Sequence, residues 1–356
     1  MRIAVNAVPM LQDTLPDTGN VLTEIFYNLC RLHPDVEFLL INNRPLRPAQ
    51  PLPPNARLVE LKPLAGGKLG QYIWRRMQWP RALRKLKADR ILSMDDVLPV
   101  PEGMPAHLLL GRNVAVLDTV SASRYIRQYA SISLFSAFMQ EQLNKRFGGL
   151  GARVQQLQPG TADVFRAVNW EEREDIKREF TSGMEYFIAL GSLDPSNNII
   201  PLLKAFSMLK KRLLSSIKLV LAGQLTGPGE DIAEALKTYK FKDDVIWLKN
   251  ADDETLARLV AAAYALVHTA GADGLAVPVY AALRCDVPVV TLYAGAAPEA
   301  GGDAALNALP NDISDLSEKM GALYKDELLR GRLLAHITRV PDWEQAARTL
   351  GNTIIG

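Results

Sequence analysis

The feature that most constrains this chain is a regular alternation of short apolar runs and helical segments between residues 186 and 293. Each apolar run has the length of a buried strand, and the segments between the runs carry apolar residues at helical spacing. Because buried strands joined by helices form parallel sheets with right-handed crossovers, the alternation predicts a doubly wound α/β domain. The strand-like runs are 186–192, 217–223, 245–250, 265–269 and 287–293.

The first half of the chain shows the same alternation less regularly. Residues 2–8, RIAVNAV, predict a strand, 20–34 predict a helix that ends at Pro34, and 36–43 predict a second buried strand. A strand, a helix and a strand in this order predict a βαβ unit. Further strands are predicted at 57–62, 89–96, 108–118 and 152–160, and helices at 71–88, 131–148 and 169–180.

The length of 356 residues exceeds a usual single core and predicts two domains. We expect an N-terminal Rossmann-like domain over 1–168 and a C-terminal Rossmann-like domain over 169–340. Residues 341–356 are expected to form a C-terminal helix that can cross back to the N-terminal domain. The hydrophobic content of 48% and charged content of 22% are typical of a globular protein, and the net charge of +2 indicates no particular partner.

Several classes of protein are excluded by simple patterns. Cys30 and Cys285 are far apart, and no CxxC or His/Cys cluster indicates a metal site, so free reduced thiols are expected. The chain begins with a strand pattern rather than a signal peptide. No run approaches the ~18 apolar residues of a membrane-spanning helix. These patterns predict a cytoplasmic protein, which can also lie peripherally at the inner face of the membrane.

Several stretches of the chain resemble the family 4 glycosyltransferases. They include FIALGSLDPSNNIIPLLKAF at 187–206, LVLAG at 219–223, the long stretch over 245–306 that contains HTAGADGLAVPVYAALRCDVPVV, and DWEQAARTL at 342–350. The N-terminal half resembles the family more loosely. The resemblance implies retaining enzymes with two Rossmann-like doubly wound domains facing across a cleft, which is the B-type glycosyltransferase fold.

The resemblance also implies a substrate and a set of contacts. A nucleotide-diphosphate sugar would be the donor, a glycan or lipid-linked molecule the acceptor, and polysaccharide biosynthesis the setting, with no metal and no further cofactor. In the family, an Arg and a Lys near the first strand of the C-terminal domain hold the diphosphate, together with backbone N–H groups at a helix N-terminus. Two glutamates eight positions apart contact the sugar and the ribose.

This chain departs from the family at each of those charged positions. Ser192 stands where the family has the Arg, and Asn197 where it has the Lys. Asp273 and Ala281 stand at the two glutamate positions. The losses would remove on the order of 5 kcal/mol of donor and transition-state stabilisation. The N-terminal domain's usual His-Asp step is also missing from the strand predicted at 108–118, because His107 precedes it.

The candidate site residues follow from this correspondence, and each has a structural alternative. Asp273 and His268 are the catalytic candidates, but Asp273 can instead cap a helix and His268 can instead pack beneath the site. Gly274 and Pro278 can instead have a purely structural role in forming the turn. Glu299 can instead be a carboxylate in the first turn of a helix. The donor-binding candidates are Ser192, Asn197, Gly274, Leu275, Ala276, Val277, Ala281, Glu299 and Gly19.

Two functions remain open at this point. The first is a sugar transferase in which another cation, for example Arg112 or Arg124, replaces the missing ones. The second is a catalytically inactive relative that serves as a partner or scaffold in glycan assembly. A nucleotide-sugar, a glycan acceptor and a protein partner are the partners expected, and no nucleic acid is expected because no recognition helix is present. Residues 73–90, rich in Lys, Arg and Trp, predict either peripheral contact with anionic lipid or a solvated helical face.

Overall fold

The computed structural model describes residues 1–11, 21–45, 50–111, 114–226, 230–338, 340 and 342–356. Gly19 and Arg112, both named as candidates from the sequence, lie outside these residues. The described residues up to Pro159, together with Trp343–Gly356, form one compact unit, here unit 1. Gly160–Asp342 form the other, unit 2. From the sequence, the divisions are expected at 168 and 340.

Unit 1 is an α/β unit in which strands and helices alternate. Its strands are β1 (Arg2–Asn6), β2 (Glu37–Asn42), β3 (Ala56–Glu60), β4 (Arg90–Met94), β5 (Ala106–Leu109), β6 (Ser131–Leu134) and β7 (Val154–Gln156). Its helices are α1 (Val21–Leu32), α2 (Gly67–Ile73), α3 (Trp79–Lys85), α4 (Val120–Tyr125), α5 (Ala137–Phe147) and α14 (Trp343–Ile355). Short 3₁₀ or π turns are η1 (Pro9–Leu11), η2 (Trp74–Gln78), η3 (Val114–Leu117), η4 (Ile126–Gln128) and η5 (Gly151–Arg153).

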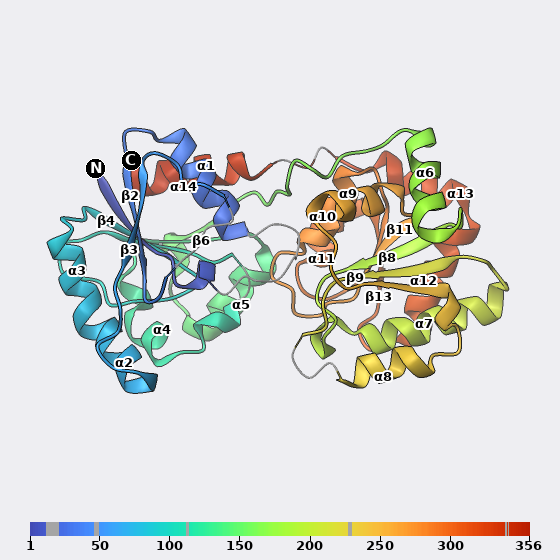
Figure 1. Ribbon diagram of the computed structural model, residues 1–356, viewed down its shortest axis with the longest axis horizontal. Coiled ribbons are helices and arrows are strands. Elements are labelled where there is room, and N and C mark those ends of the chain that lie inside the picture. Colours follow the sequence, from blue (N-terminus) through green and yellow to red (C-terminus); the bar gives the residue numbers. More distant parts are fainter. Residues whose placement is uncertain (12–20, 46–49, 112–113, 227–229, 339, 341) are drawn as a thin grey trace. The chain divides into compact units, whose positions relative to one another are not determined.

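Among the described residues of unit 1, seven strands form one parallel sheet in the order β3-β2-β1-β4-β5-β6-β7. Strands β1, β2, β4, β5 and β6 are almost wholly buried apart from their first residues, since helices cover both faces of the sheet, whereas the edge strand β3 is only partly buried. In Figure 1, α1 and α14 lie on one side of this sheet and α4 and α5 on the other.

Unit 2 repeats the architecture. Its strands are β8 (Tyr186–Leu190), β9 (Lys218–Ala222), β10 (Val245–Leu248), β11 (Ala265–His268), β12 (Val289–Leu292) and β13 (Ala305–Ala308). Its helices are α6 (Trp170–Thr181), α7 (Ile199–Leu213), α8 (Glu230–Thr238), α9 (Asp253–Ala262), α10 (Val277–Arg284), α11 (Ala297–Gly301), α12 (Ile313–Lys325) and α13 (Glu327–Ala335). Short turns are η6 (Pro195–Asn197), η7 (Lys242–Asp244) and η8 (Gly302–Ala304).

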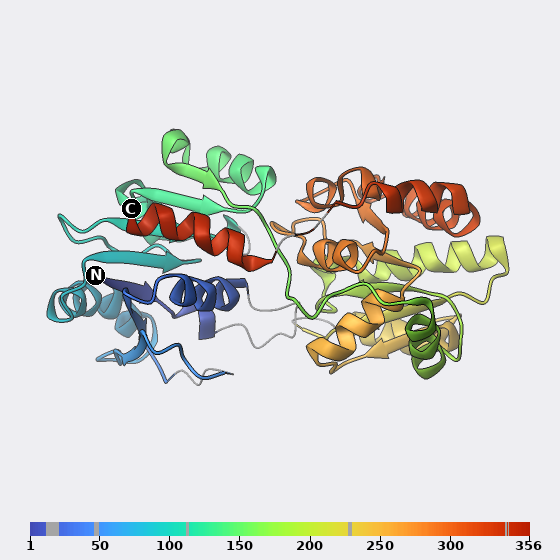
Figure 2. The same ribbon diagram turned by 90° about the horizontal axis from the view of Figure 1, so that it is seen from above.

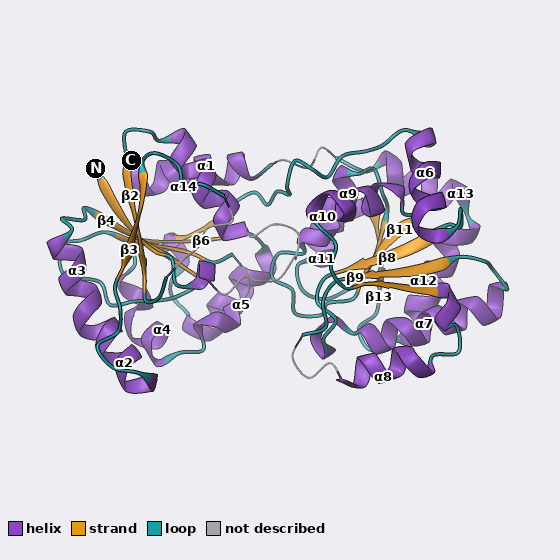
Figure 3. Cartoon of the chain, in the orientation of Figure 1, coloured by secondary structure: helices purple, strands orange, loops and turns teal. Residues whose placement is uncertain are grey.

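In the described part of unit 2, six parallel strands are ordered β10-β9-β8-β11-β12-β13. Figures 2 and 3 show this sheet, like that of unit 1, enclosed by helices. The core on one face is built from the apolar residues of α7 and α12 packed on the strands, including Phe187, Phe206 and Met320. The predicted fold class of two parallel-sheet Rossmann-like domains is therefore confirmed.

The C-terminal helix α14 packs against α1 within unit 1, as Figures 1 and 2 show. It buries Trp343 and Leu350, and Glu344 accepts a hydrogen bond from Arg31 at 2.7 Å. At Gly351 the packing is so close that an added Cβ would lie 2.3 Å from His33 Nε2. A residue larger than glycine there would force the two helices apart.

The helical segment around Pro80 is continuous from Gly67 to Lys85. It runs through α2, the π turn η2 and α3. Pro80 has no N–H to donate within a helix, and the wider turn before it places a bond from Trp79 N to the carbonyl of Trp74. Trp74 and Arg75 both lie in this π turn, and Trp74 is buried.

Three secondary-structure predictions differ from the structure. The strand predicted at 108–118 is instead β5, Ala106–Leu109, so His107 lies within the strand and not before it. The helix predicted at 131–148 begins only at Ala137, after the cap Ser136 accepts a bond from Met139 N, because 131–134 form β6. Strand β13, which the sequence did not indicate, is short and only partly buried, so it lacks a strong apolar pattern.

None of the helices in the described residues combines the length and apolar character that crossing a bilayer requires.

Candidate functional site

The strand order of unit 2 reverses between β8 and β11. In open parallel sheets, ligands bind beyond the carboxyl ends of the strands at this switch point. The two segments that follow these strands are 191–198, here the first loop, and 269–276, here the second loop. Most of the site residues predicted from the sequence fall on these two loops.

The first loop is closed around Asp194. Its carboxylate accepts hydrogen bonds from Ser192 Oγ at 2.7 Å and from the backbone N–H of Ser196 at 2.8 Å. Burial alone would raise the pKa of Asp194, but the hydrogen bonds from Ser196 and Ser192 outweigh it and lower the pKa. Asn197 Nδ2 donates to the carbonyl of Ser192 at 2.6 Å. The polar atoms at both predicted cation positions are thus used within the loop.

The second loop is organised by Asp273. Its Oδ1 accepts hydrogen bonds from the backbone N–H groups of Leu275 at 2.9 Å and Ala276 at 3.0 Å. These groups immediately precede α10, and the sequence assigned the N–H groups of this turn to a donor phosphate. A carboxylate of the chain itself therefore occupies the place where an external anion would bind.

The other oxygen of Asp273 lies beside His268. The distance from His268 Nε2 to Asp273 Oδ2 is 3.3 Å, and the histidine side chain is only 5% exposed. Nε2 is not aligned for a hydrogen bond in the structure, so we treat the pair as an electrostatic contact. Burial would raise the pKa of Asp273, but His268 and the two backbone bonds lower it. The two catalytic candidates are thus neighbours.

The two loops are hydrogen-bonded to each other and to Ala296, in the segment that follows β12. Asn198, with a left-handed φ of 52°, donates from Nδ2 to the carbonyl of Thr269 at 2.8 Å. Thr269 Oγ1 donates to the carbonyl of Asn197 at 2.6 Å. Ala296 N donates to the carbonyl of Asp273 at 2.8 Å. These bonds make one connected framework at the carboxyl edge of the sheet.

The remaining candidates lie as follows. Ala281 is fully buried on α10, so a glutamate there would bury a charge. Glu299 is exposed in the first turn of α11. Burial, then the charges of Glu299 and Asp273, raise the pKa of Tyr280, which places this tyrosine near both carboxylates. Gly274, Leu275, Ala276 and Val277 are buried, and Gly19 lies outside the described residues.

Among the described residues, the carboxylates of Asp194 and Asp273 form no ion pair with a Lys or an Arg. Arg284, at the end of α10, pairs with Asp163 at 2.6 Å. Arg124, proposed as a replacement cation, lies in unit 1 with its guanidinium over the Tyr125 ring at 5.7 Å. The described residues also contain no cluster of three or more His, Cys, Asp or Glu side chains that could hold a metal ion.

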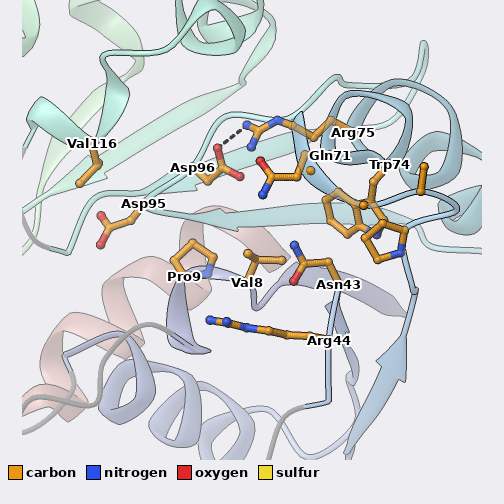
Figure 4. Close-up of a pocket in the computed structure, with 14 residues that line it drawn as sticks. Val8, Pro9, Asn43, Arg44, Gln71, Trp74, Arg75, Asp95, Asp96 and Val116 are labelled. Atoms are coloured by element: carbon orange, nitrogen blue, oxygen red, sulfur yellow. Dashed lines mark hydrogen bonds and ion pairs between the residues drawn. The ribbon is translucent and has the colours of Figure 1, made fainter. Parts of the chain in front are cut away.

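A pocket that the sequence analysis missed lies in unit 1. It has a volume of about 620 Å³ and opens beyond β1 and β4, where the strand order of this sheet also reverses. Figure 4 shows its side chains coming from the loops after β1, β2 and β4 and from the helical segment 67–85. The signal that could have found it is the pair Asp95 and Asp96 at the end of the strand predicted at 89–96. The lining is Val8, Pro9, Asn43, Arg44, Pro63, Ala65, Gly66, Gly67, Gln71, Trp74, Arg75, Asp95, Asp96 and Val116.

The polar groups of this pocket are partly held in place. Arg75 donates to Asp96 at 2.5 Å, a contact marked in Figure 4, and to the carbonyl of Val97 at 3.0 Å. Asp95 has a left-handed φ of 47° and accepts the N–H of Gly111 at 2.7 Å. Arg44, Asn43 and Gln71 also line the pocket, with Trp74 as an apolar wall. Carboxylates, guanidinium groups and amides beside an aromatic ring can hydrogen-bond the hydroxyls of a sugar and cover its apolar face.

The fold is that of B-type glycosyltransferases. The chain matches the crystal structure of WaaG, a glycosyltransferase involved in lipopolysaccharide biosynthesis, with a TM-score of 0.76 and 15% identity over 100% of both chains. It also matches Anabaena Alr3699/HepE in complex with UDP and glucose, with a TM-score of 0.73 and 13% identity over 100% of this chain and 99% of that one. At these identities the likeness establishes the fold.

The sequence of unit 2 is also similar to that of known glycosyltransferases. Residues 171–337 match the family described as glycosyl transferases group 1. The O-antigen chain mannosyltransferase B of Escherichia coli is 29% identical over 145 residues, which are 41% of this chain and 38% of the relative. The serotype-specific mannosyltransferase WbdA of Escherichia coli is 24% identical over 190 residues, which are 52% of this chain and 23% of the relative. The match thus spans well under half the length of these curated relatives. Residues 171–337 are thus similar to group 1 glycosyl transferases, while membership of the whole chain in that family and retention of configuration stay predictions.

Proposed function

We propose that the protein transfers a sugar from a nucleotide-sugar donor to a glycan or lipid-linked acceptor in polysaccharide assembly. The observation that carries the proposal is that the match to group 1 glycosyl transferases runs through both switch-point loops of unit 2. Two relatives are named mannosyltransferases, which supports mannose as the transferred sugar. Retention of configuration and independence of a metal ion are part of the proposal, since the resemblance implies both.

The two sites take different parts of the reaction in this proposal. The donor lies on the loops of unit 2, where Asp273 and His268 are the groups closest to the expected sugar. The acceptor's hydroxyls use the pocket of unit 1, where Asp95, Asp96 and Arg44 supply hydrogen-bonding groups.

Donor cleavage is the demanding step. Negative charge develops on the departing diphosphate, and preorganised donors or cations normally stabilise it. Here Ser192 and Asn197 supply no charge, and the N–H groups of Leu275 and Ala276 already bond Asp273. A charge-assisted hydrogen bond contributes roughly 1.5–3 kcal/mol, so the absence of two cations would slow transfer by several orders of magnitude unless another group compensates.

A second candidate function is favoured by that same arrangement. A first loop closed around Asp194 and a second loop capped by Asp273 suit a non-catalytic relative that partners an active transferase. The full burial of Ala281 supports it as well, because no side chain there reaches a ribose.

Calorimetric titration with nucleoside diphosphates and their sugars, including a mannose donor, tests the proposal directly. Heat with one nucleotide-sugar, followed by release of its nucleoside diphosphate when a glycan acceptor is added, is the expected result. Silence across the panel refutes the transferase and leaves the non-catalytic partner. Burial raises the pKa of Cys30 and of Cys285 to about 12, so these thiols will not interfere in the assay.

A gain-of-charge variant tests where the donor binds. Ser192→Arg with Asn197→Lys restores the two family cations and should tighten binding of the donor at least tenfold. Thr238→Arg with Leu214→Lys adds the same charge at exposed positions of unit 2 and should leave binding unchanged. An equal gain in both double variants would mean that net charge, and not the first loop, governs donor binding.

A further inference from the structure

Two of the four charged side chains that line the unit 1 pocket are paired with each other. Arg75 donates to Asp96 and to the carbonyl of Val97, so a carboxylate balances its charge. Asp96 is also held from its other side, because its Oδ2 accepts a hydrogen bond from Asn6 Nδ2 at 3.2 Å. This pair therefore adds no net charge to the pocket.

The third charged side chain, Asp95, has partners within unit 1. The residue is only 4% exposed, and its Oδ1 accepts the backbone N–H of Gly111 at 2.7 Å. In Figure 4 its carboxylate points away from the other labelled side chains of the pocket. The negative charge of Asp95 is thus directed at the backbone beyond β5.

The fourth charged side chain, Arg44, differs from the other three. It lies two residues after β2 and is exposed. Within the part of the chain that the structure describes, its guanidinium group forms no ion pair or hydrogen bond. Figure 4 shows this group extending along the pocket below Val8 and Pro9. Because a guanidinium group is always charged and presents its N–H donors as a planar fork, it suits a ligand oxyanion.

The rest of the lining fits an uncharged sugar ring. Asn43 and Gln71 carry amides, which both donate and accept hydrogen bonds. Trp74, Val8 and Pro9 supply apolar surface. The volume of about 620 Å³ falls within the range of roughly 300–1,000 Å³ that is usual for small-molecule sites. The pocket therefore has room for a sugar ring together with a charged substituent.

We propose that this pocket selects an acidic acceptor, a sugar unit that carries a phosphate or carboxylate group, and that Arg44 binds that group. The amides and the apolar wall hold the ring, while the guanidinium fork takes two oxygens of the substituent. The inference rests on the proposed function, in which the pocket holds the acceptor. It goes further by assigning the charge of the acceptor and the residue that recognises it.

Saturation-transfer NMR titrations of the full chain test this selection in the absence of any donor. The probes are mannose-6-phosphate, glucuronic acid and mannose. One of the two acidic sugars should bind roughly tenfold more tightly than mannose, because hydrogen bonds between charged groups are the strong ones. Tighter binding of mannose-6-phosphate identifies a phosphate, and tighter binding of glucuronic acid identifies a carboxylate. Equal affinity for all three sugars refutes the proposal.

Variants at position 44 locate the effect. Arg44→Gln should lower the affinity for the acidic sugar to that for mannose. Arg44→Lys keeps the charge but loses the planar fork, so it should retain part of the preference. The matched control is Arg81→Gln, which removes the same charge from an exposed position of α3 outside the pocket and should bind every probe like the wild type. An equal loss in Arg44→Gln and Arg81→Gln would mean that net charge alone attracts the acidic sugar, which overturns the proposal.

Two further measurements separate recognition of a charged sugar from simpler binding. Gln71→Ala should weaken the binding of mannose and of the acidic sugar by the same factor, because Gln71 contacts only the ring in this proposal. Inorganic phosphate should bind at least roughly tenfold more weakly than mannose-6-phosphate, since it lacks the ring. If the two phosphates bind equally, the pocket is a simple anion site and the proposal fails.

The outcome is independent of the test of sugar transfer, because these titrations contain no nucleotide-sugar. Loss of the acidic preference would leave the donor titration as the test of the transferase. A silent donor titration with the acidic preference intact would refute the transferase and leave the selectivity of the pocket standing.

Discussion

The hydrogen-bonded turn that Asp273 forms just before α10 leads to a quantitative prediction. Asp273→Ala removes the acceptor for the N–H groups of Leu275 and Ala276, at 2.9 and 3.0 Å. Two lost hydrogen bonds cost about 2 kcal/mol together, and removal of the His268 contact works in the same direction. At about 2–4 °C per kcal/mol for a unit of this size, unit 2 should melt roughly 4–8 °C lower.

The assay compares three variants by calorimetry and amide exchange. Asp273→Asn keeps an oxygen for both N–H groups and should cost under about 1 kcal/mol. Asp273→Glu places the carboxylate one methylene further out, so it should destabilise unit 2 like Asp273→Ala. If the proposed donor site is correct, the Glu variant should also bind the nucleotide-sugar more tightly, since its longer side chain no longer occupies the N–H groups.

The pH dependence has a definite sign. Because the folded pKa of Asp273 is lowered from 3.8, its contribution is present above about pH 4 and lost as the pH falls through the folded value. The gap between wild type and Asp273→Ala should therefore close in acid. An Asp273→Ala protein that melts within 1 °C of wild type at neutral pH, with unchanged exchange at residues 275 and 276, would refute the reasoning.

The remaining predictions concern three other positions. Burial and then the charge of Arg90 lower the pKa of His107 to about 4, so unit 1 should lose about 3 kcal/mol of stability as the pH falls from 6.5 to 4. Urea titrations should show that slope flattened in His107→Gln. Asn198→Ala should cost unit 2 about 1–2 kcal/mol through the lost bond to Thr269 and a left-handed φ of 52°, whereas Asn198→Gly should recover the backbone part, as melting curves would reveal. Gly295→Ala should destabilise unit 2 still more, because its Cβ would lie 2.7 Å from the Asp273 carbonyl at a φ of +65°; a thermally neutral variant would contradict this.

The first loop shows how far a sequence comparison reaches. The positions of Ser192 and Asn197 could be read from the chain because they stand two and seven residues after β8. What the comparison could not supply is that Asp194 gathers Ser192 and Ser196 into a closed hydrogen-bonded turn. That arrangement depends on side-chain directions, which residue identity does not specify.

The unit 1 pocket, by contrast, could not be located from the sequence. Its lining comes from separate segments between Val8 and Val116, and only the sheet order brings the ends of β1 and β4 together. The bond from Arg75 to Asp96 likewise joins a helical segment to the loop after β4, 21 residues further along the chain. No local sequence pattern predicts a site that is assembled from such separate segments.

The sequence by itself determined the alternation of strands and helices, because buried parallel strands and amphipathic helices each leave a local apolar period. It also determined the lack of cationic side chains at the donor positions and the excess of positive charge in 61–88. Only the tertiary structure decided which groups meet: Asp273 folds back onto its own helix, His107 lies inside a strand, and Trp74 and Trp79 enter the core. These outcomes follow from packing and hydrogen-bond geometry among residues distant in the chain, which a one-dimensional pattern does not contain.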